Sequence, residues 1–313
     1  MPFPTPITIP SSYEALDLTH VKISHHPPGK PTATPVVIVT LNRPEKNNAF
    51  TPQMADSLEW AFRTFHLDSR VKVVVLTGAG RMFCAGSDLE IGFGNGEGRA
   101  VDFRDIGGRV TLAMHRCHKP TVVALNGSAV GVGMTMTLPA AIRICHEKSK
   151  YGFVFTRRGL TIESCASFFL PRLIGLSKAM SLITTGGIFP GTSTYFGDLF
   201  TEVLPDAAQV LPRALELAHE MAENASPLAS AMSRTLMWEG PQSPEAAHLL
   251  ESRVFHHMTG QSDYKEGVNS FLEKRKANFQ SDPHEKSPQD YPWWSEIDIK
   301  IEPQASKASK SKL

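Results

Sequence analysis

Cysteine is scarce in this chain, and its few copies are scattered. Only four of the 313 residues are cysteines, and no two of them form a C-x-x-C pair. This spacing argues against a cysteine-based metal site and against a disulfide framework. We therefore expect no metal site, and we expect small buried thiols in a reducing compartment at Cys84, Cys117, Cys145 and Cys165.

The sequence also lacks an excess of charge of either sign and any long apolar run. Its formal net charge is +1, which gives no indication of a nucleic-acid or membrane-surface partner. No stretch approaches the roughly 20 apolar residues of a membrane span. The first residues, MPFPTPITIPSSYEALDLTH, have no basic region followed by an apolar run, so they do not resemble a signal peptide.

Apolar runs and helical patterns alternate along the chain. Short β-branched or apolar runs predict buried strands at residues 36–41, 71–77, 121–125, 141–145 and 150–155. Thr51 followed by Pro52 predicts the start of a helix. This alternation is typical of α/β proteins whose sheet faces are covered. We expect an irregular leader (1–18), a core (19–205), a helical region (206–279) and a flexible tail (280–313).

Three segments carry residues that suit chemistry. Residues 83–89 and 126–133 are rich in small side chains and follow strands, so each can present backbone N–H groups to a ligand. Two such segments in one domain can supply two donors to one oxyanion. The third segment, residues 159–166, carries Glu163 among small and apolar neighbours. Burial there would raise the pKa of this carboxyl and allow proton transfer near neutral pH.

Four stretches together resemble the crotonase, or enoyl-CoA hydratase/isomerase, superfamily. They are LNRPEKNNAF, VVVLTGAGRMFCAGSDL, KPTVVALNGSAVGVG and EGVNSFLEKRKANF, which follow the family's order. The resemblance implies an α/β fold, with a spiral of stacked ββα turns followed by a helical trimerisation region. It further implies a homotrimer or a dimer of trimers, an acyl-coenzyme A substrate and no other cofactor.

The resemblance also assigns roles to individual positions. The N–H groups of Ser87 and Val132 fall where relatives hold the thioester carbonyl. The residues at or near positions that contact coenzyme A in relatives are Arg43, Lys46, Ala85 and Lys274. For the three charged residues among them, the alternative is that they are exposed charges that only keep the protein soluble.

The chain departs from a typical hydratase at both catalytic acids. The two positions where hydratases carry glutamates are occupied by Thr135 and Phe155. Glu163, in the segment GLTIESCASFFLPR, instead falls where peroxisomal Δ3,Δ2-enoyl-CoA isomerases keep their single catalytic glutamate. Ser164 replaces the glycine that usually follows it. The sequence therefore most resembles these isomerases.

We accordingly expect an isomerase in which Glu163 moves a proton from C2 to C4 of a 3-enoyl-CoA. One alternative is hydration, dehydration or thioester hydrolysis on the same scaffold, with a second acid, Asp102 or Asp105, from the glycine-rich segment 91–108. Another alternative is an inactive coenzyme A-binding or scaffold protein. The segment 91–108 is also where we expect the acyl pocket.

The chain ends in Ser311-Lys312-Leu313, and a carboxy-terminal S-K-L is the peroxisomal targeting signal. The preceding residues are small, polar and basic, so they can extend into the import receptor without unfolding a core. We therefore expect a peroxisomal location. Fatty-acid β-oxidation is the default pathway, and a secondary-metabolite pathway is the alternative.

Overall fold

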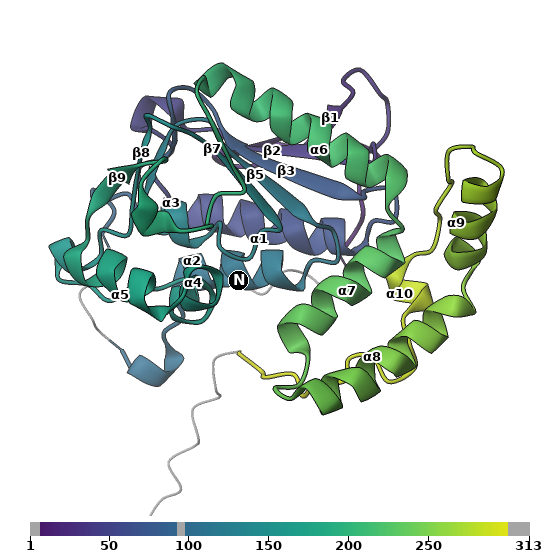
Figure 1. Ribbon diagram of the computed structural model, residues 1–313. Coiled ribbons are helices and arrows are strands. Elements are labelled where there is room, and N and C mark those ends of the chain that lie inside the picture. The colour runs from purple at the N-terminus through teal and green to yellow at the C-terminus, as the bar shows by residue number, and fades with distance from the viewer. Residues whose placement is uncertain (1–6, 93–97, 300–313) are drawn as a thin grey trace, which may run out of the picture.

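The computed structural model describes residues 7–92 and 98–299 and contains two β-sheets surrounded by helices (Figure 1). The strands are β1 (Val21–His26), β2 (Val36–Leu41), β3 (Val73–Gly78), β4 (Met82–Cys84), β5 (Thr121–Leu125), β6 (Ser128–Val130), β7 (Ile142–His146), β8 (Lys150–Gly152), β9 (Ile188–Pro190) and β10 (Glu202–Leu204). The larger sheet has the order β1-β2-β3-β5-β7-β10, and the smaller sheet has the order β4-β6-β8-β9. The outer strands β1 and β9 are antiparallel to their neighbours, and the other pairs are parallel.

The helices pack around these sheets and continue beyond them. They are α1 (Pro52–Leu67), α2 (Ile106–Arg116), α3 (Val132–Thr135), α4 (Ala166–Ile174), α5 (Leu176–Thr185), α6 (Val210–Asn224), α7 (Pro227–Glu239), α8 (Pro244–Thr259), α9 (Ser262–Leu272) and α10 (Pro283–Lys286). None of the helices within residues 7–92 and 98–299 combines the length and the apolarity needed to cross a membrane.

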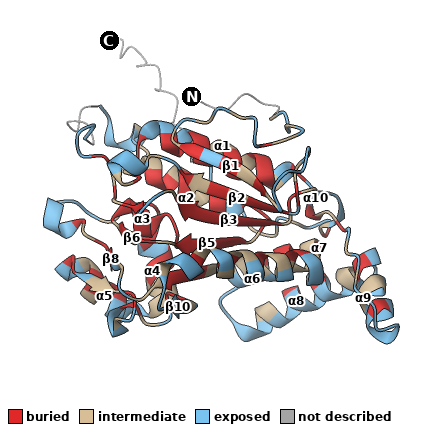
Figure 2. Ribbon diagram, turned by 90° about the horizontal axis from the view of Figure 1, so that it is seen from above, coloured by how far each residue is buried: buried red, intermediate tan, exposed pale blue. Residues whose placement is uncertain are grey.

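The main core lies on both faces of the larger sheet. All six residues of β3 are buried, because helices cover the sheet on either side. Val73 and Val75 pack against α6, whereas Val74 and Leu76 belong to the apolar cluster that includes the buried faces of α1 and α2. Figure 2 shows β2, β3 and β5 between α1 and α2 on one side and α6 on the other.

The chain passes between the two sheets in a repeated order. The strands β3, β5 and β7 belong to the larger sheet, and the strand that follows each of them, β4, β6 or β8, belongs to the smaller one. The helix α2 follows β4, and α3 follows β6. This is the expected spiral of ββα turns, and the helices α6 to α9 follow it. The predicted fold class is therefore confirmed.

Local sequence signals predicted several element boundaries. The strands β2 and β5 have the predicted bounds, and α1 begins at Pro52 with the Thr51 hydroxyl accepting the N–H of Met54 at 3.1 Å. β8 ends at Gly152, three residues before the predicted end, because Phe153 turns into the core. Sequence reasoning did not predict β1, which pairs with β2 at the sheet edge.

Residues 280–293, which belong to the predicted flexible tail, pack on the body of the protein. Ser281 and Pro283 are buried, and Tyr291 and Trp293 pack on the apolar cluster of α7 and α8. The indole N–H of Trp293 donates to the carbonyl of Glu239 at 3.0 Å. These contacts join segments that are distant in sequence. The predicted targeting residues 311–313 lie outside the described residues.

The predicted leader also contributes a residue to the core. Residues 7–18 contain no helix or strand, but Tyr13 is buried and its hydroxyl donates to Asp68 at 2.8 Å.

The four cysteines are free thiols, and three of them are buried while Cys165 is half-buried. Burial raises the pKa of the Cys84 thiol, which makes it a poor nucleophile at neutral pH.

Candidate active site

The smaller sheet brings two of the three predicted segments together. β4 pairs with β6, so that Cys84 lies opposite Ala129. Beyond these strands, a Cβ on Gly133 would lie only 2.8 Å from the Cβ of Cys84, and a Cβ on Gly131 would lie 3.9 Å from the Cα of Gly86. The turn after β4 and the start of α3 are therefore in contact, and glycine permits their close approach.

The N–H group of Ser87 points away from Phe50, to which the residues on either side of Ser87 are hydrogen-bonded. Phe50 forms an isolated parallel bridge with Ser87. In this bridge the N–H of Phe50 donates to the carbonyl of Gly86 at 2.8 Å, and the N–H of Asp88 donates to the carbonyl of Phe50 at 2.9 Å. Successive backbone groups of an extended chain point to opposite sides, so the N–H of Ser87 is directed away from Phe50.

The N–H group of Val132 is a helix-terminal donor. Val132 is the first residue of α3, where a helix offers no internal acceptor to an N–H group. Since the turn that carries Ser87 contacts the start of α3, the two N–H groups come from adjoining segments. This arrangement suits the binding of one oxyanion by two backbone donors.

The carboxylate of Glu163 lies beside α3. The hydroxyl of Thr135 donates to Oε1 of Glu163 at 2.8 Å, and the hydroxyl of Ser164 donates to Oε2 at 2.5 Å. Thr135 is three residues after Val132 on the same helix, so their side chains share one face. The structure therefore brings the predicted acid next to the predicted oxyanion segments.

The surroundings of Glu163 favour its protonated form. Burial raises the pKa of its carboxyl to about 8, and the nearby Asp105 carboxyl acts in the same direction. The hydroxyls of Ser164 and Thr135 lower the pKa but do not outweigh burial. A carboxyl with this pKa can accept and return a proton near neutral pH, as general acid–base catalysis requires.

Asp105 is the second acid at this site, and α2 holds it in place. Its side chain caps α2, with Oδ1 accepting the N–H of Gly108 at 2.5 Å. The same oxygen accepts the backbone N–H of Ser164 at 3.1 Å. Of the two acids considered in the segment 91–108, Asp105 is therefore the one that reaches Glu163, whereas Asp102 forms an ion pair with Arg99 at 3.3 Å.

The backbone at Ser164 has a conformation that favours glycine. Ser164 has a φ of 55°, in the left-handed region that costs an ordinary residue roughly 1–2 kcal/mol. Here the serine hydroxyl contacts Glu163, and its N–H contacts Asp105. These two hydrogen bonds offset the backbone strain, so the departure from glycine links the two acids.

Gly107 makes room for the Glu163 carboxylate. A Cβ at this position in the first turn of α2 would overlap Oγ of Ser164 and Oε2 of Glu163, and it would lie 3.0 Å from Cγ2 of Val132. Sequence reasoning missed this residue, because the atoms that surround it come from distant segments. It also missed the capping role of Asp105, although an aspartate just before a helical turn is a recognisable N-cap signal.

Two predicted coenzyme A residues lie in the turn after β2 and already have acidic partners. Nη1 of Arg43 lies 2.5 Å from Oδ2 of Asp88, and both side chains are largely buried. Nζ of Lys46 lies 2.8 Å from Oε2 of Glu90, and both of these side chains are exposed. The Arg43 pair therefore fixes the turn against the segment after β4. The exposed Lys46 pair is weak and can be exchanged for a phosphate.

The other two predicted coenzyme A residues differ in position. The N–H of Ala85 donates to the carbonyl of Asn47 at 3.1 Å, so Ala85 lies next to the turn that carries Lys46. Lys274 is exposed just after α9, which lies at the opposite end of the molecule from α3 and α4 (Figures 1 and 2). Within one chain, Lys274 is not part of this site.

Comparisons with known proteins identify the family of this chain. The family described as enoyl-CoA hydratase/isomerase matches residues 32–282. The enoyl-CoA hydratase ACTT3 of Alternaria alternata is 44% identical over 257 residues, which are 82% of this chain and 87% of the relative. The 1,2-epoxyphenylacetyl-CoA isomerase of Escherichia coli is 29% identical over 249 residues, which are 78% of this chain and 94% of the relative.

Solved structures show the same fold. The crystal structure of an enoyl-CoA hydratase from Bacillus anthracis matches with a TM-score of 0.74 at 25% identity, covering 83% of this chain and 99% of that one. The crystal structure of an enoyl-CoA hydratase from Mycobacterium tuberculosis matches with a TM-score of 0.72 at 26% identity. The match covers 83% of this chain and 98% of that one. With its spiral fold, its adjoining donor segments and a family match over most of its length, this chain belongs to the enoyl-CoA hydratase/isomerase family.

Proposed function

We propose that the protein is an acyl-CoA double-bond isomerase of the Δ3,Δ2-enoyl-CoA isomerase type. The observation that carries this proposal is the position of Glu163. Its carboxylate accepts a hydrogen bond from the hydroxyl of Thr135, which lies about one helical turn after Val132 on α3. Thr135 and the buried Phe155 occupy the positions of the hydratase acids and cannot transfer protons in their place. Glu163 is therefore the residue best placed to act as the base beside the N–H donors.

The proposed reaction needs one proton to move between two carbons. The thioester carbonyl accepts hydrogen bonds from the N–H groups of Ser87 and Val132. The ionised Glu163 removes a proton from C2, and the electrons of that C–H bond pass into a dienolate whose oxygen the two donors stabilise, at roughly 3 kcal/mol per donor. Glu163 then returns the proton to C4, and the double bond ends between C2 and C3.

Exposed apolar side chains in the segment before Asp105 support an acyl substrate. Ile91, Val101 and Phe103 precede Asp105 in the chain and are 53%, 46% and 67% exposed. Apolar side chains with this exposure, in the segment that leads to Asp105, suit the binding of an aliphatic chain. We propose a fatty acyl-CoA as the substrate, with its phosphates near the exposed Lys46.

Hydration is a second candidate function, and Asp105 is the observation that favours it. Two carboxyls side by side can divide the work of activating water and of protonating C2. The relative from Alternaria alternata also carries the name enoyl-CoA hydratase. In this mechanism Asp105 and Glu163 would both be essential, whereas in the isomerase Asp105 only positions Ser164 and raises the pKa of Glu163.

Separate incubation of the purified enzyme with a 3-enoyl-CoA and with a 2-enoyl-CoA tests the two functions. We expect conversion of the 3-enoyl to the 2-enoyl thioester, a loss of about 10²–10⁴-fold in Glu163→Gln and a much smaller loss in Asp105→Asn. If the enzyme instead hydrates the 2-enoyl thioester without moving a double bond, and if both variants lose this activity, the protein is a hydratase. Coenzyme A binding without turnover of either thioester would support an inactive scaffold.

We also propose a peroxisomal location and assembly into a homotrimer or a dimer of trimers. The terminal S-K-L supports the first proposal. Exposed apolar side chains on α8 and α9, such as Phe255 and Phe271 at 70% and 82% exposure, support the second. Imaging of a fluorescent protein fused to the N-terminus, with and without residues 311–313, tests the location. Light scattering from the purified protein tests the assembly.

A further inference from the structure

We propose that His66, His118 and His284 form a binding site for a divalent transition metal ion such as Zn²⁺. Each residue offers one ring nitrogen, and the three nitrogens lie within 4.8 Å of one another. The ring centroid of His66 lies 4.2 Å from that of His118 and 4.3 Å from that of His284. Imidazole nitrogen is a preferred ligand of Zn²⁺, Cu²⁺ and Ni²⁺.

The three histidines come from separate parts of the fold. His66 is in the last turn of α1, His118 is in the turn between α2 and β5, and His284 is in α10. A metal ion held by all three would therefore join the segment 280–299 to the body. Because Asp105 is at the opposite end of α2, this site is separate from the acyl-CoA site.

Hydrogen bonds to the outer nitrogens orient two of the rings as metal ligands. Nε2 of His284 lies 2.6 Å from the carbonyl of His66, which can only accept, so Nε2 carries the proton and Nδ1 carries the lone pair. Nε2 of His118 lies 2.9 Å from the hydroxyl of Tyr291, a suitable acceptor. Partners of this kind fix the tautomer of metal-binding histidines.

The inner nitrogen of His118 is the strongest indication of a ligand. His118 is only 9% exposed, and its Nδ1 has no hydrogen-bond partner among the described residues. A buried nitrogen without a partner is costly, and metal coordination would satisfy it. Nδ1 of His66 accepts only a long hydrogen bond, 3.3 Å from the backbone N–H of His118, so coordination there would replace a weak interaction.

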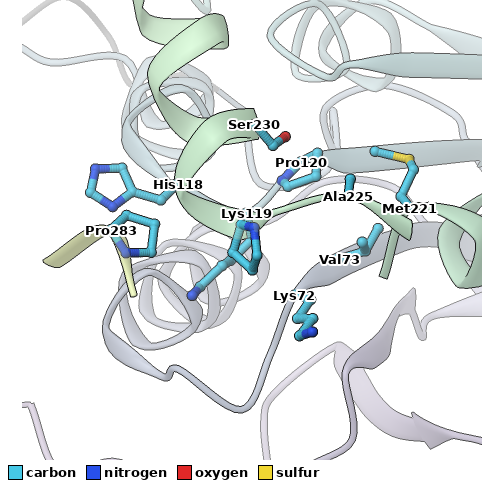
Figure 3. A pocket seen from close by; sticks show the side chains of 10 residues that line it. Lys72, Val73, His118, Lys119, Pro120, Met221, Ala225, Ser230 and Pro283 are labelled. Carbon is cyan, nitrogen blue, oxygen red and sulfur yellow. The ribbon is translucent and has the colours of Figure 1, made fainter. Parts of the chain in front are cut away.

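The surroundings leave room for the small movements that coordination requires. Zn–N distances of about 2.0–2.1 Å require the nitrogens to move closer together. His284 is exposed and therefore able to move. Figure 3 shows His118, Lys119 and Pro283 beside a cavity of about 20 Å³, which is room for about one water molecule. The contact between α10 and the body is thus not fully packed here.

Some of the charged side chains near His118 oppose the binding of a metal cation, and others favour it. Lys119 and Arg234 place positive charge near His118, whereas Asp282 and Asp68 offset the charge of Lys119. We therefore expect moderate affinity, and tighter binding when Lys119 is replaced by methionine.

Titration of the full chain with ZnCl₂, after chelator treatment and without a polyhistidine tag, tests the proposal. We expect saturable binding of one ion per chain by calorimetry and a rise in Tm. Tryptophan fluorescence should change as well, because Trp293 and Trp294 lie in the segment that the metal would hold. Co²⁺ should give the visible absorption of a nitrogen-ligated site.

Matched variants separate this site from adventitious binding. His284 and His256 are both exposed histidines on helices, so neither His284→Gln nor His256→Gln should unfold the protein. We expect at least tenfold weaker Zn²⁺ binding in His284→Gln, unchanged binding in His256→Gln, tighter binding in Lys119→Met and unchanged acyl-CoA turnover in all three. Absence of saturable binding, or equal affinity in the two histidine variants, would overturn the proposal.

Discussion

The pKa of Glu163 determines the pH range in which the proposed isomerase works. The carboxyl must be ionised to remove the proton from C2, and its pKa is raised to about 8, mainly by burial. We therefore expect kcat/KM for a 3-enoyl-CoA to rise about tenfold per pH unit below about pH 8 and to level off above it. Initial rates between about pH 6 and pH 10 measure this profile. A profile that is flat between pH 6 and pH 8 would contradict the proposed role of Glu163.

The same raised pKa predicts that Glu163 destabilises the fold at alkaline pH. The folded protein keeps the proton up to about pH 8, whereas the ordinary pKa of 4.5 applies when the chain is unfolded. The stabilising contribution of the protonated carboxyl is therefore fully present below about pH 4.5 and is lost as the pH rises through about 8. Glu163→Gln, which is neutral at every pH, should raise the free energy of unfolding by a few kcal/mol at about pH 9 and by much less at about pH 5.

Urea unfolding at these two pH values measures the difference. Glu251→Gln, which removes an exposed glutamate on α8, is the matched control and should show no such dependence on pH. If Glu163→Gln changed the stability equally at both pH values, the carboxyl would not be held protonated in the folded protein. This result would also remove the basis for the expected rate profile.

Sequence reasoning identified single residues of the site only where one segment carried the signal. Glu163 was identified because its own segment matched a family pattern. Gly107 was not identified, because its importance depends on atoms of Glu163 and Ser164 that fold onto it from about 55 residues away. Asp105 was considered as an acid, but its bond to the backbone of Ser164 required the structure.

At the scale of elements, short-range signals were sufficient for α1 and β3 but not for the smaller sheet. The cap at Thr51 and the apolar run of β3 are local properties of the chain. The strands β4 and β6 have only three residues each, and they exist because they pair with each other. Pairing between segments about 45 residues apart leaves no local pattern, although it is this pairing that places the two donor segments side by side.

The first turn of α2 is an element that the site depends on. A methyl group on Gly107 would overlap the side chains of Glu163 and Ser164, so Gly107→Ala should displace the carboxylate. We expect kcat to fall at least tenfold while the protein remains folded, since a misplaced catalytic group is costly even over short distances. Steady-state kinetics together with circular dichroism measure this.

Gly267→Ala in α9 is the matched control for this variant. A Cβ there would lie 3.5 Å from Phe279, which is ordinary contact, so activity should not change and stability should not fall. Full activity in Gly107→Ala would show that the carboxylate can work from another position. The single-base geometry proposed for Glu163 would then be untenable.

At the scale of the whole molecule, the order of segments was predictable but their distances were not. The stretch around Lys274 matches the family, yet within one chain it lies far from α3 (Figure 1). The proline-rich and charged composition after residue 280 favoured a flexible tail. In residues 280–299, Tyr291 and Trp293 pack on α7 and α8, and we expect their burial to outweigh the cost of ordering these residues.

Two truncations test this docking at the scale of the chain. A protein that ends at residue 299 keeps the contacts among residues 7–92 and 98–299 and serves as the reference for the second truncation. A protein that ends at residue 279 loses the Trp293 hydrogen bond and exposes the cluster around Leu228 and Met232. Each large apolar side chain contributes roughly 1.5–3 kcal/mol when buried, so we expect several kcal/mol of lost stability, a lower Tm and aggregation. Equal melting temperatures for the two truncated proteins would show that residues 280–299 do not stabilise the fold, and the contacts of Tyr291 and Trp293 would then be incidental.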